Sequence, residues 1–426
     1  MDEPPTTRTT ARTRPRTRTV RGLAVAAATG LSLAALPAGV AAAGGHVLRV
    51  GPGEAYGSIQ DAVDAAASGA TVELAPGTYT EAVCVEGKGL TIVGSGRDRT
   101  IIDWPRGRLP AVAAAPCWTE QERVDPADTT PGDVSDNVSA LFFLHPDGPV
   151  GVTALQTRDH PASGIVAEGA DGFEVTGTKG VGHGRYGIQA ADSTRSRIAG
   201  NVEIGVDRGT AGAPVRGTAA IAVADSADAR ARVAGNTVEG YSIGILARES
   251  RGGRIAGNSV SGNCLGVVVF DDAATEIPDA TRNVAGGDWA IVGNRSAEND
   301  LLCRSTRGRG TALLSGVGVQ VTNADDVDVR GNAIQDNGPA VDPATLGSPA
   351  GGLVLLSQPP FANPLGTDPG PVEDVRVVGN TITGNVPVDV LLGSPAVNPI
   401  LRPVGEGIEF HGNTCDASVP PDICTP

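Results

Sequence analysis

A Gly-Asn dipeptide that follows a short alternation of apolar residues recurs along the chain, and its spacing constrains the fold more than any other feature. The asparagines of the copies are Asn201, Asn236, Asn258, Asn294, Asn332, Asn380 and Asn413. Successive copies lie 35, 22, 36, 38, 48 and 33 residues apart. This spacing indicates a unit of about 22 to 24 residues that insertions often lengthen. The phrases FEVTGT and VGVTAL continue the register upstream, because Thr178 lies 23 residues before Asn201 and Leu155 another 23 residues before Thr178.

Each unit also contains a phrase of the form Gly-Ile-x-Val before the Gly-Asn and a third short phrase after the asparagine. These phrases have a period of two, are rich in β-branched residues and are bounded by Gly, Asn, Asp and Ser, as strands are. The Gly-Ile-x-Val phrases begin at Gly164, Gly187, Ala220, Gly244, Gly266, Gly318 and Gly352. Three short parallel strands per turn, with no helix between them, predict an all-β fold: a parallel β-helix solenoid of about ten coils with loop insertions.

The asparagines have a structural task in such a coil. The chain must bend sharply at each Gly-Asn, and both residue types accept left-handed backbone at low cost. Asparagines stacked one strand spacing apart can also hydrogen-bond along the solenoid axis as an amide ladder. A second asparagine recurs five residues after the first, so the sequence predicts two ladders. The second set consists of Asn263, Asn299, Asn337 and Asn385.

The N-terminal segment has the pattern of an export signal. Six arginines lie between Arg8 and Arg21, residues 22–40 are apolar and small, and residues 41–43 are three alanines. Residues 1–43 are therefore expected to be a secretory signal peptide. No later apolar run reaches the length of a membrane span. We expect the mature chain to be secreted to the extracellular space or cell surface, with no membrane span.

Residues 44–426 are expected to form a single β-helix domain and a monomer. Its expected parts are the N-terminal cap and first coils (44–103), an insertion (104–140), the repeat coils (141–413) and a C-terminal tail (414–426). Removal of the signal takes six arginines and two acids from 33 basic and 48 acidic residues, which leaves a formal net charge of −19. Such a charge repels phosphates and argues against nucleic acid as a partner.

The six cysteines of an exported chain are most simply three disulfides. Of the fifteen possible connectivities, we expect the one in which Cys84–Cys117 pins the first long insertion, Cys264–Cys303 joins neighbouring coils and Cys415–Cys424 closes the tail. A metal site is the weaker interpretation, because there is no C-x-x-C pair and the histidines do not cluster with the cysteines.

The start of the mature chain carries the most specific motifs. Ser58 is a natural N-cap, and residues 59–67 read as a short amphipathic helix that can close the first coil. The order S-I-Q-x-A-V, then P-G-T-Y-x-E, then L-T-I-x-G resembles the opening of the pectin-lyase-like superfamily of right-handed β-helices. With the Gly-Asn repeats, this resemblance covers nearly the whole mature chain. It implies a right-handed β-helix but no single activity, because the superfamily includes lyases, esterases, hydrolases, epimerases, phage tailspikes and copper-site maturation factors.

Insertions lengthen the coil on both sides of the Gly-Ile-x-Val strand. They span residues 207–217, 271–289, 301–315, 338–351, 357–373 and 391–406. We therefore expect the sheet built from this strand to form the floor of a groove. The alternative is that the loops have no functional role. The expected substrate-binding residues on this floor are Glu168, Gln189, Arg248, Phe270, Gln320 and Asp389.

The catalytic candidates lie near two histidines. His160 in TRDHPAS and His183 in VGHGRYG are 23 residues apart, so their imidazoles could lie side by side on neighbouring coils. Such groups could move a proton beside a uronate carboxylate while an arginine neutralises its charge. The alternative is that both histidines are solvated turn residues. The full candidate set is His160, His183, Asp159, Arg185, Tyr186 and Asp207.

No enzyme family of the superfamily is matched by its motifs. The Gly182-His183-Gly184 sequence resembles the G-H-G of polygalacturonases, but the N-T-D, D-D and R-I-K motifs that accompany it there are missing. Asp159-His160 resembles the D-H of pectate lyases without their R-x-P-x-x-R, and the pectinesterase motifs Q-D-T-L and D-F-I-F-G are missing too.

An acidic residue recurs once per coil and could chelate Ca²⁺ across the coil spacing. The alternative is that these are ordinary turn formers. The residues are Asp192, Asp225, Glu249 and Asp271. No other cofactor is indicated. The tryptophans Trp104, Trp118 and Trp289 sit in separate insertions, so at most one is expected to line the groove.

Two hypotheses of function follow. The first is a secreted β-helix protein that binds and processes an extracellular polysaccharide, as a lyase, hydrolase or epimerase, at the corner of His160 and His183. The second is a non-catalytic surface or matrix protein that is structural or binds a glycan or a partner. An enzyme needs titratable groups that converge on a shared point, whereas a binding protein needs only a lined trench.

Overall fold

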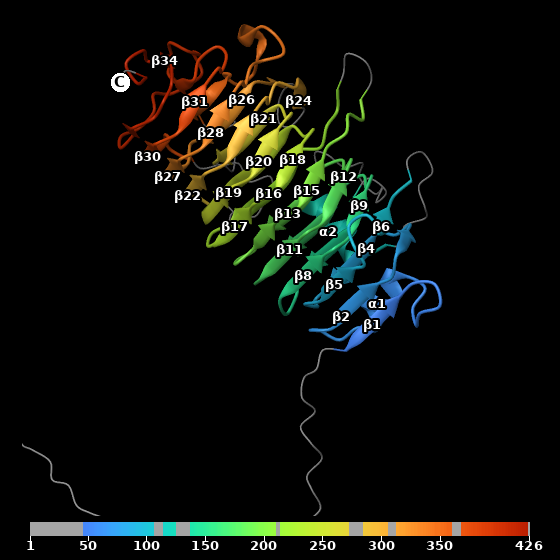
Figure 1. Cartoon of the computed structure of the whole chain (residues 1–426). Helices are drawn as coiled ribbons and strands as arrows, with labels where there is room; N and C mark the ends of the chain where they lie inside the picture. The colour runs from blue at the N-terminus through green and yellow to red at the C-terminus, as the bar shows by residue number, and fades with distance from the viewer. Residues whose placement is uncertain are drawn as a thin grey trace, which may run out of the picture. The chain divides into compact units, whose positions relative to one another are not determined.

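The structure is a computed structural model that describes residues 46–105, 114–124, 137–209, 214–271, 284–305, 312–359 and 368–424. Residues Gly45–Pro426 form one compact unit. In this unit the chain winds into a parallel β-helix, so the all-β solenoid predicted from the repeat is confirmed (Figure 1). The predicted signal peptide lies outside the described residues, as do segments within the insertions and the last two residues of the tail.

Three parallel sheets form the walls of the solenoid. Sheet A holds the strands before each Gly-Asn turn: β1(Val47–Val50), β2(Thr71–Leu74), β5(Thr91–Gly94), β8(Val150–Thr153), β11(Phe173–Thr176), β14(Arg197–Ala199), β17(Ala231–Ala234), β22(Gly287–Val292), β27(Asp325–Arg330), β30(Glu373–Val378) and β33(Glu409–His411). Sheet B holds the ten strands that follow these turns: β3(Gly77–Tyr79), β6(Thr100–Asp103), β9(Gln156–Arg158), β12(Lys179–Val181), β15(Val202–Ile204), β18(Thr237–Glu239), β20(Ser259–Ser261), β23(Arg295–Ala297), β28(Ala333–Gln335) and β31(Thr381–Thr383).

Sheet C holds the Gly-Ile-x-Val strands: β4(Val83–Glu86), β7(Leu141–Leu144), β10(Ile165–Glu168), β13(Tyr186–Ala191), β16(Ala219–Ser226), β21(Leu265–Phe270), β26(Val317–Thr322), β29(Gly351–Leu356), β32(Val390–Leu392) and β34(Ser418–Val419). One long strand, β19(Ile243–Ala256), runs from sheet C into sheet A. Within the insertions lie α2(Pro116–Val124), the antiparallel hairpin of β24(Cys303–Ser305) and β25(Ala312–Leu314), and a 3-10 turn η4(Pro343–Thr345).

The core follows from the period of two along each strand. Alternate residues of a strand point into the solenoid, where residues at the same position of successive coils stack in columns. Ile188 of β13 is in register with Ile221 of β16, which is in register with Ile245 of β19, and all three are buried. Such aliphatic columns bury apolar surface continuously along the axis, which is the main stabilising contribution in a repeat fold.

The first asparagine column forms the predicted ladder. The Oδ1 of Asn294 accepts hydrogen bonds from the main-chain N (3.0 Å) and the Nδ2 (2.9 Å) of Asn258 on the preceding coil. Its Nδ2 donates to the carbonyl of Ile255 and to Oδ1 of Asn332 on the next coil. The left-handed backbone falls on the glycines, for example Gly257 and Gly293 at φ 62°, and the asparagines do not share it. The reason is that each asparagine side chain must point into the turn to reach its neighbours along the axis.

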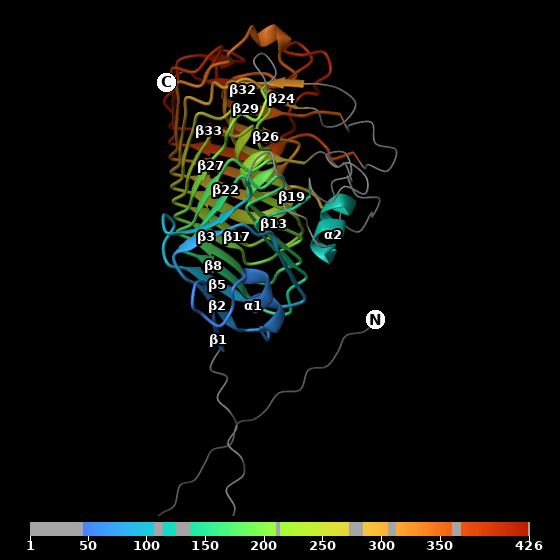
Figure 2. The same ribbon diagram turned by 90° about the vertical axis from the view of Figure 1, so that its right-hand side faces the viewer.

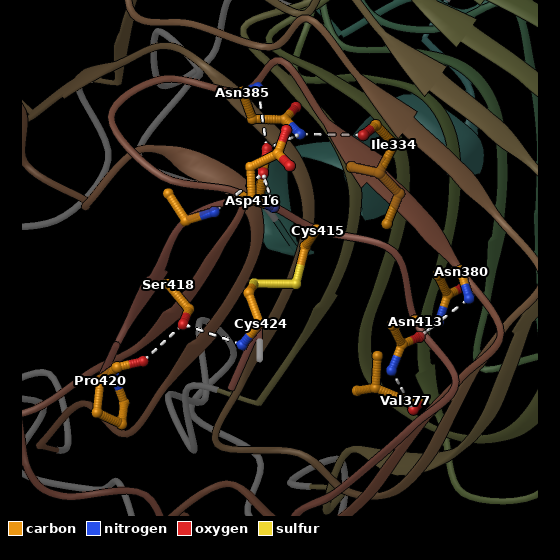
Figure 3. Close-up of a disulfide and its surroundings, with 12 residues drawn as sticks. Ile334, Val377, Asn380, Asn385, Asn413, Cys415, Asp416, Ser418, Pro420 and Cys424 are labelled. Atoms are coloured by element: carbon orange, nitrogen blue, oxygen red, sulfur yellow. Dashed lines mark hydrogen bonds between the residues drawn. A yellow bond between two sulfur atoms is a disulfide. The ribbon is translucent and has the colours of Figure 1, made fainter. Parts of the chain in front are cut away.

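The second asparagine column ends on a carboxylate. Asn385 donates its main-chain N (3.1 Å) and its Nδ2 (2.9 Å) to Oδ1 of Asp389, which stands where the next coil would supply an asparagine. Oδ2 of Asp389 accepts from the main-chain N of Asp416 at 2.8 Å. Figure 3 shows this end of the ladder beside Asn385 and Asp416. Asp389 was expected on the groove floor; instead it is 2% exposed and its carboxylate is used by the turn.

Both ends of the solenoid are covered. At the N-terminal end α1(Ile59–Ala65) buries Ile59 and Val63 in the core, and Oγ of Ser58 accepts from the N–H of Asp61, as the sequence predicts. At the C-terminal end the tail is tied back by a disulfide between Cys415 and Cys424 (Figure 3). Capping is necessary because an open coil would expose apolar side chains and unpaired backbone groups.

All three predicted disulfides are present. Cys84–Cys117 joins β4 to α2, Cys264–Cys303 joins neighbouring coils, and Cys415–Cys424 closes the tail. The Cα–Cα distances are 5.7, 5.9 and 5.2 Å, within the range in which a disulfide forms without moving the backbone.

We predict that Asn294→Ala lowers the free energy of unfolding by about 3 kcal/mol. The reason is that the substitution leaves the buried N–H groups of Asn258 and the carbonyl of Ile255 without partners. Urea unfolding at equilibrium measures the change. The matched control is Asn413→Ala at the half-buried end of the ladder, where water can replace the lost bonds and the expected loss is about 1 kcal/mol or less. Equal losses in the two variants would contradict this account of the ladder.

Candidate functional site

The outer face of sheet C is where the sequence placed a groove, and five of the six predicted floor residues do point outward there. Because Val166 and Glu168 of β10 alternate with the core residues Ile165 and Ala167, their side chains lie on the outer face. The residues with this orientation are Glu168, Gln189, Arg248, Phe270 and Gln320.

This face is not an open trench along its whole length. It carries apolar side chains such as Leu246 and Val354 that are 4% and 0% exposed and pack in a cluster with Leu401. At the other end α2 packs against β4 and β7, and the Trp118 ring lies 6.4 Å from the Phe142 ring. The insertions therefore cover much of the face that they were expected to frame.

The five floor residues differ in their accessibility. Gln189, Arg248 and Phe270 are half-buried. Glu168 and Gln320 are 2% and 6% exposed, and the Gln320 amide donates to Oγ1 of Thr322 at 2.9 Å. The accessible part of the outer face thus lies at the middle coils.

The two histidines lie side by side, as the spacing of one coil predicts, but inside the protein. Their ring centroids are 5.9 Å apart and both side chains are 0% exposed. Nε2 of His160 donates to the carbonyl of Glu81 at 2.9 Å, and Nε2 of His183 lies 2.9 Å from Oγ1 of Thr157. Burial lowers the pKa of His160 to about 4. Burial, with the neighbouring His160 and Arg208, also lowers the pKa of His183 well below its usual value. Both imidazoles are therefore neutral near pH 7, and neither reaches solvent.

The other predicted catalytic residues do not converge with the histidines on a point that a substrate can reach. Asp207 is exposed, and its Oδ1 accepts from the N–H groups of Gly209 and Val215 across its loop. Asp159 is half-buried in a left-handed turn conformation at φ 62°. Arg185 is 4% exposed and donates to Oδ1 of Asn137, and Tyr186 lies on the outer face of sheet C at 7% exposure.

A buried carboxyl group that the sequence analysis missed lies near this corner. Glu203 of β15 points into the core at 1% exposure, and the Tyr241 hydroxyl lies 3.4 Å from its Oε2. Burial raises the pKa of Glu203 well above its usual value and also raises that of Tyr241. The signal was available, because the residue two after Gly-Asn is Val238, Val260, Ser296, Ile334, Ile382 or Cys415 in the other coils and an acid only here.

The acidic residues recur once per coil as expected, and three of the four have left-handed backbone. Asp192, Asp225 and Glu249 have φ of 45°, 52° and 44°, a region that Asp and Asn tolerate better than most residues. Asp271 accepts from the N–H of Gly286 at 2.8 Å. Within the described parts of the chain, no three His, Cys, Asp or Glu side chains gather closely enough to hold a metal ion.

A cleft of about 560 Å³ lies between α1 and α2, and we call it the α1–α2 cleft. Its floor is the start of the outer face of sheet C, and its lining includes residues of α1 and α2, the helices labelled in Figure 2. It is lined by Gln60, Val63, Asp64, Thr80, Glu81, Ala82, Cys84, Glu86, Lys88, Trp104, Ala114, Ala115, Pro116 and Trp118. The cleft combines two indoles with three carboxylates, an amide and an ammonium group.

The polar groups of the α1–α2 cleft are partly committed. Glu81 accepts from the N–H groups of Ile59 and Gln60 and so caps α1. Lys88 donates to the carbonyls of Val63 and Asp64, which leaves the third donor of its ammonium group for a ligand. Asp64 and Glu86 are exposed carboxylates at the rim.

His160 supports this cleft from behind. Its ring lies 5.6 Å from the Trp104 ring, and its Nε2 holds the carbonyl of Glu81. Trp104 and Glu81 are both cleft residues. The histidine that the sequence suggested as a catalytic group is thus a neutral buried group in contact with two walls of the cleft.

Comparison with known proteins supports the fold. Residues 163–359 match the family model described as a right handed beta helix region, which confirms the handedness expected from the sequence. No curated protein sequence matches the chain. Among the described residues, no helix is both long and apolar enough to cross a membrane.

Several solved structures have a similar course of the chain. The A-module of a mannuronan C-5 epimerase from Azotobacter vinelandii has a TM-score of 0.46 and 17% identity, over 83% of this chain and 89% of that one. The catalytic domain of a GH87 α-1,3-glucanase in complex with nigerose has a TM-score of 0.44 and 12% identity, over 89% and 67%. A family 28 exopolygalacturonase from Yersinia enterocolitica has a TM-score of 0.40 and 11% identity, over 87% and 76%.

We predict that Glu203→Gln stabilises the protein at neutral pH. Because the folded-state pKa of Glu203 is raised, the folded chain keeps a proton that the unfolded chain loses above pH ~4.3. The wild type therefore loses about 1.4 kcal/mol of stability per pH unit above that value, until the folded-state pKa is reached. Urea unfolding from pH 4 to 8 should show the variant gaining over the wild type as pH rises.

The control for this measurement is Glu239→Gln, an exposed carboxylate on the neighbouring strand β18. It should follow the wild-type pH dependence. A Glu203→Gln variant that runs parallel to the wild type at all pH values would contradict the assignment of a buried, proton-retaining carboxyl group.

Proposed function

We propose that this right-handed parallel β-helix protein of the pectin-lyase-like superfamily binds an extracellular polysaccharide, and that the α1–α2 cleft is the main binding site. The observation that carries the proposal is the lining of that cleft, in which Trp104 and Trp118 accompany the rim carboxylates of Asp64 and Glu86. Its volume of about 560 Å³ falls in the usual range of ligand sites.

The chemistry of the cleft suits a sugar. A sugar ring presents apolar C–H groups on its faces and hydroxyl groups at its edge, so it needs an apolar wall and surrounding hydrogen-bond partners. The apolar wall is formed by Ala82, Ala115 and Pro116 together with the edges of the largely buried indoles of Trp104 and Trp118. Asp64 and Glu86 can accept hydrogen bonds from hydroxyl groups, and the free donor of Lys88 can bind a hydroxyl or a carboxylate.

Sheet C offers a second accessible stretch at its middle coils, separated from the cleft by the buried Leu144 and Glu168. The outward column that contains Glu86 continues in register through Leu144 and Glu168 toward Arg248 and Phe270. Gln189 lies in the adjacent outward column. We assign the half-buried Gln189, Arg248 and Phe270 to contacts with sugar residues beyond the cleft.

His160 acts in this proposal as a positioning residue. It is neutral and buried, and it contacts Trp104 and the Glu81 carbonyl rather than solvent. Replacement by alanine should therefore weaken binding through the cleft walls. His183 touches Thr157 and not the cleft, so its replacement should have a smaller effect on binding.

A more specific proposal is that the protein also cleaves or epimerises the polysaccharide that it binds. Acid-base chemistry on a glycan commonly uses two carboxyl groups. With Glu81 committed to α1, Asp64 and Glu86 are the carboxylates of the cleft left for that task. If neither turns over a glycan, the protein is a binding or structural component of an extracellular surface or matrix.

Two features support secretion as part of this proposal. Residues 1–43 have the pattern of a signal peptide. Three disulfides tie down α2, two neighbouring coils and the tail, and such bonds persist in oxidising compartments outside the cytosol.

We predict that Asp64→Ala and Glu86→Ala each weaken glycan binding by about three- to tenfold, because each removes one polar contact of ordinary strength. Calorimetric titration of neutral and uronate-containing polysaccharides into the secreted chain measures binding. Release of reducing ends and of unsaturated uronates measures turnover in the same samples, with and without Ca²⁺.

The matched control is Glu239→Ala, which removes an exposed carboxylate far from the cleft lining. It should bind as the wild type does. Wild-type affinity in both cleft variants would exclude the α1–α2 cleft as the binding site. Binding without product in the wild type would favour the non-catalytic role.

A further inference from the structure

The outer face of sheet A carries a column of arginines on three consecutive strands. Arg197 of β14 is in register with Arg232 of β17, which is in register with Arg254 of β19. All three side chains are exposed. Neighbouring strands of a sheet lie about 4.7–4.9 Å apart, so the column presents one guanidinium group per coil at that spacing. We call it the arginine column.

The surroundings leave the arginine column open. In the next outward position of the same strands stand Ala199, Ala234 and Ala256, whose small side chains do not cover it. Arg197 pairs with Glu174 of the preceding coil. Within the described parts of the chain, Arg232 and Arg254 have no ion-pair partner, whereas Arg330 and Arg376 on later strands of the same sheet pair with Asp328 and Glu409.

A shallow recess adjoins the column. It measures about 510 Å³ and includes Arg197 and its neighbour Arg195 in its wall. The remaining wall is Thr91, Pro149, Val150, Gly151, Val152, Thr153, Gly172, Phe173, Glu174 and Thr176. The hydroxyl groups of this wall lie on the same outer face, one to three coils before the arginines. The recess and the column therefore form one continuous surface along the solenoid axis.

The charge pattern of this surface favours the binding of an anion. Like charges directly opposite one another on neighbouring strands repel and destabilise a sheet. The column concentrates positive charge in a chain whose formal net charge is −15, and further along the same outward position the sequence changes to Ala290 and then Asp328. Arg376 follows Asp328 at this position but pairs with Glu409, so the uninterrupted arginine column spans three coils, which sets the length of ligand that it fits.

We propose that the arginine column binds the anionic groups of a linear acidic polysaccharide, one carboxylate or sulfate per coil. The rise per coil is similar to the length of one sugar residue in an extended chain, so successive acidic residues can face successive arginines. The guanidinium fork binds carboxylate and sulfate through paired hydrogen bonds. Sugar hydroxyl groups would meet the threonines of the adjoining recess.

A nucleic acid fits this surface less well. Proteins that bind single-stranded nucleic acid commonly stack its bases on aromatic side chains, and the aromatic side chain in the recess wall, Phe173, is buried. The surface lies on sheet A and shares no lining residue with the α1–α2 cleft. This proposal can therefore be tested independently of the function proposed for the cleft.

The test is calorimetric titration of the secreted chain with oligogalacturonate, dextran sulfate, neutral dextran and single-stranded polythymidylate. We expect binding to oligogalacturonate, dextran sulfate or both that weakens as salt is raised, and none to neutral dextran. The double substitution Arg232→Gln and Arg254→Gln should weaken acidic-glycan binding by about tenfold or more and reduce the slope of log affinity against log salt by about one to two.

The matched control is the double substitution Arg330→Gln and Arg376→Gln on the same sheet, which should leave binding unchanged. Circular dichroism and the melting temperature confirm that these exposed substitutions leave the fold intact. Unchanged binding in the Arg232/Arg254 variant, an equal loss in the control, absence of acidic-glycan binding, or equally tight binding of polythymidylate would each overturn the proposal. Asp64→Ala should leave this binding intact; a loss there without a loss in the arginine variant would assign the acidic glycan to the cleft instead.

Discussion

The stacking of asparagines along the axis is the interaction on which the rest of the structure depends. Each rung, such as Asn258 on Asn294, joins two coils through both the main-chain N–H and the side-chain amide. The bonds are buried, so each is expensive to leave unmade and each fixes the register of one coil on the next. That register aligns the aliphatic columns of the core. It also aligns whatever the strands carry on their outer faces.

Because the coils are held in register, any residue type that repeats once per coil becomes a linear array. Inside, the arrays are Val, Ile and Leu, and the acidic arrays at the turns serve left-handed backbone. Outside, the sheets differ. Sheet C carries apolar residues and is largely covered by insertions, with the α1–α2 cleft at its N-terminal end. Sheet A keeps an exposed polar face with arginines at the spacing of the coils. The two surfaces offer a polysaccharide different chemistry.

The buried polar groups near the same corner show what the scaffold tolerates. Glu203 replaces an aliphatic core residue, and His160 and His183 are held neutral by burial. Burial of such groups costs free energy that only hydrogen bonding or neutralisation reduces. His160 has a positioning role, because it contacts Trp104 and the carbonyl of Glu81 in the cleft wall.

The sequence by itself determined the coil. The Gly-Asn spacing and the period of two predicted the solenoid and both ladders, because these depend on contacts between neighbouring coils that repeat at a fixed separation. The Ser58 cap is a contact within one helical turn, and the three disulfides pair cysteines that follow one another along the chain, so the sequence indicated these as well. Only the tertiary structure decided which faces are open. Burial of His160 and His183, the use of Asp389 by a turn and the cleft between α1 and α2 depend on how insertions far apart in the chain fold back over the coils. Those insertions have no repeat, so their sequence does not indicate where they pack.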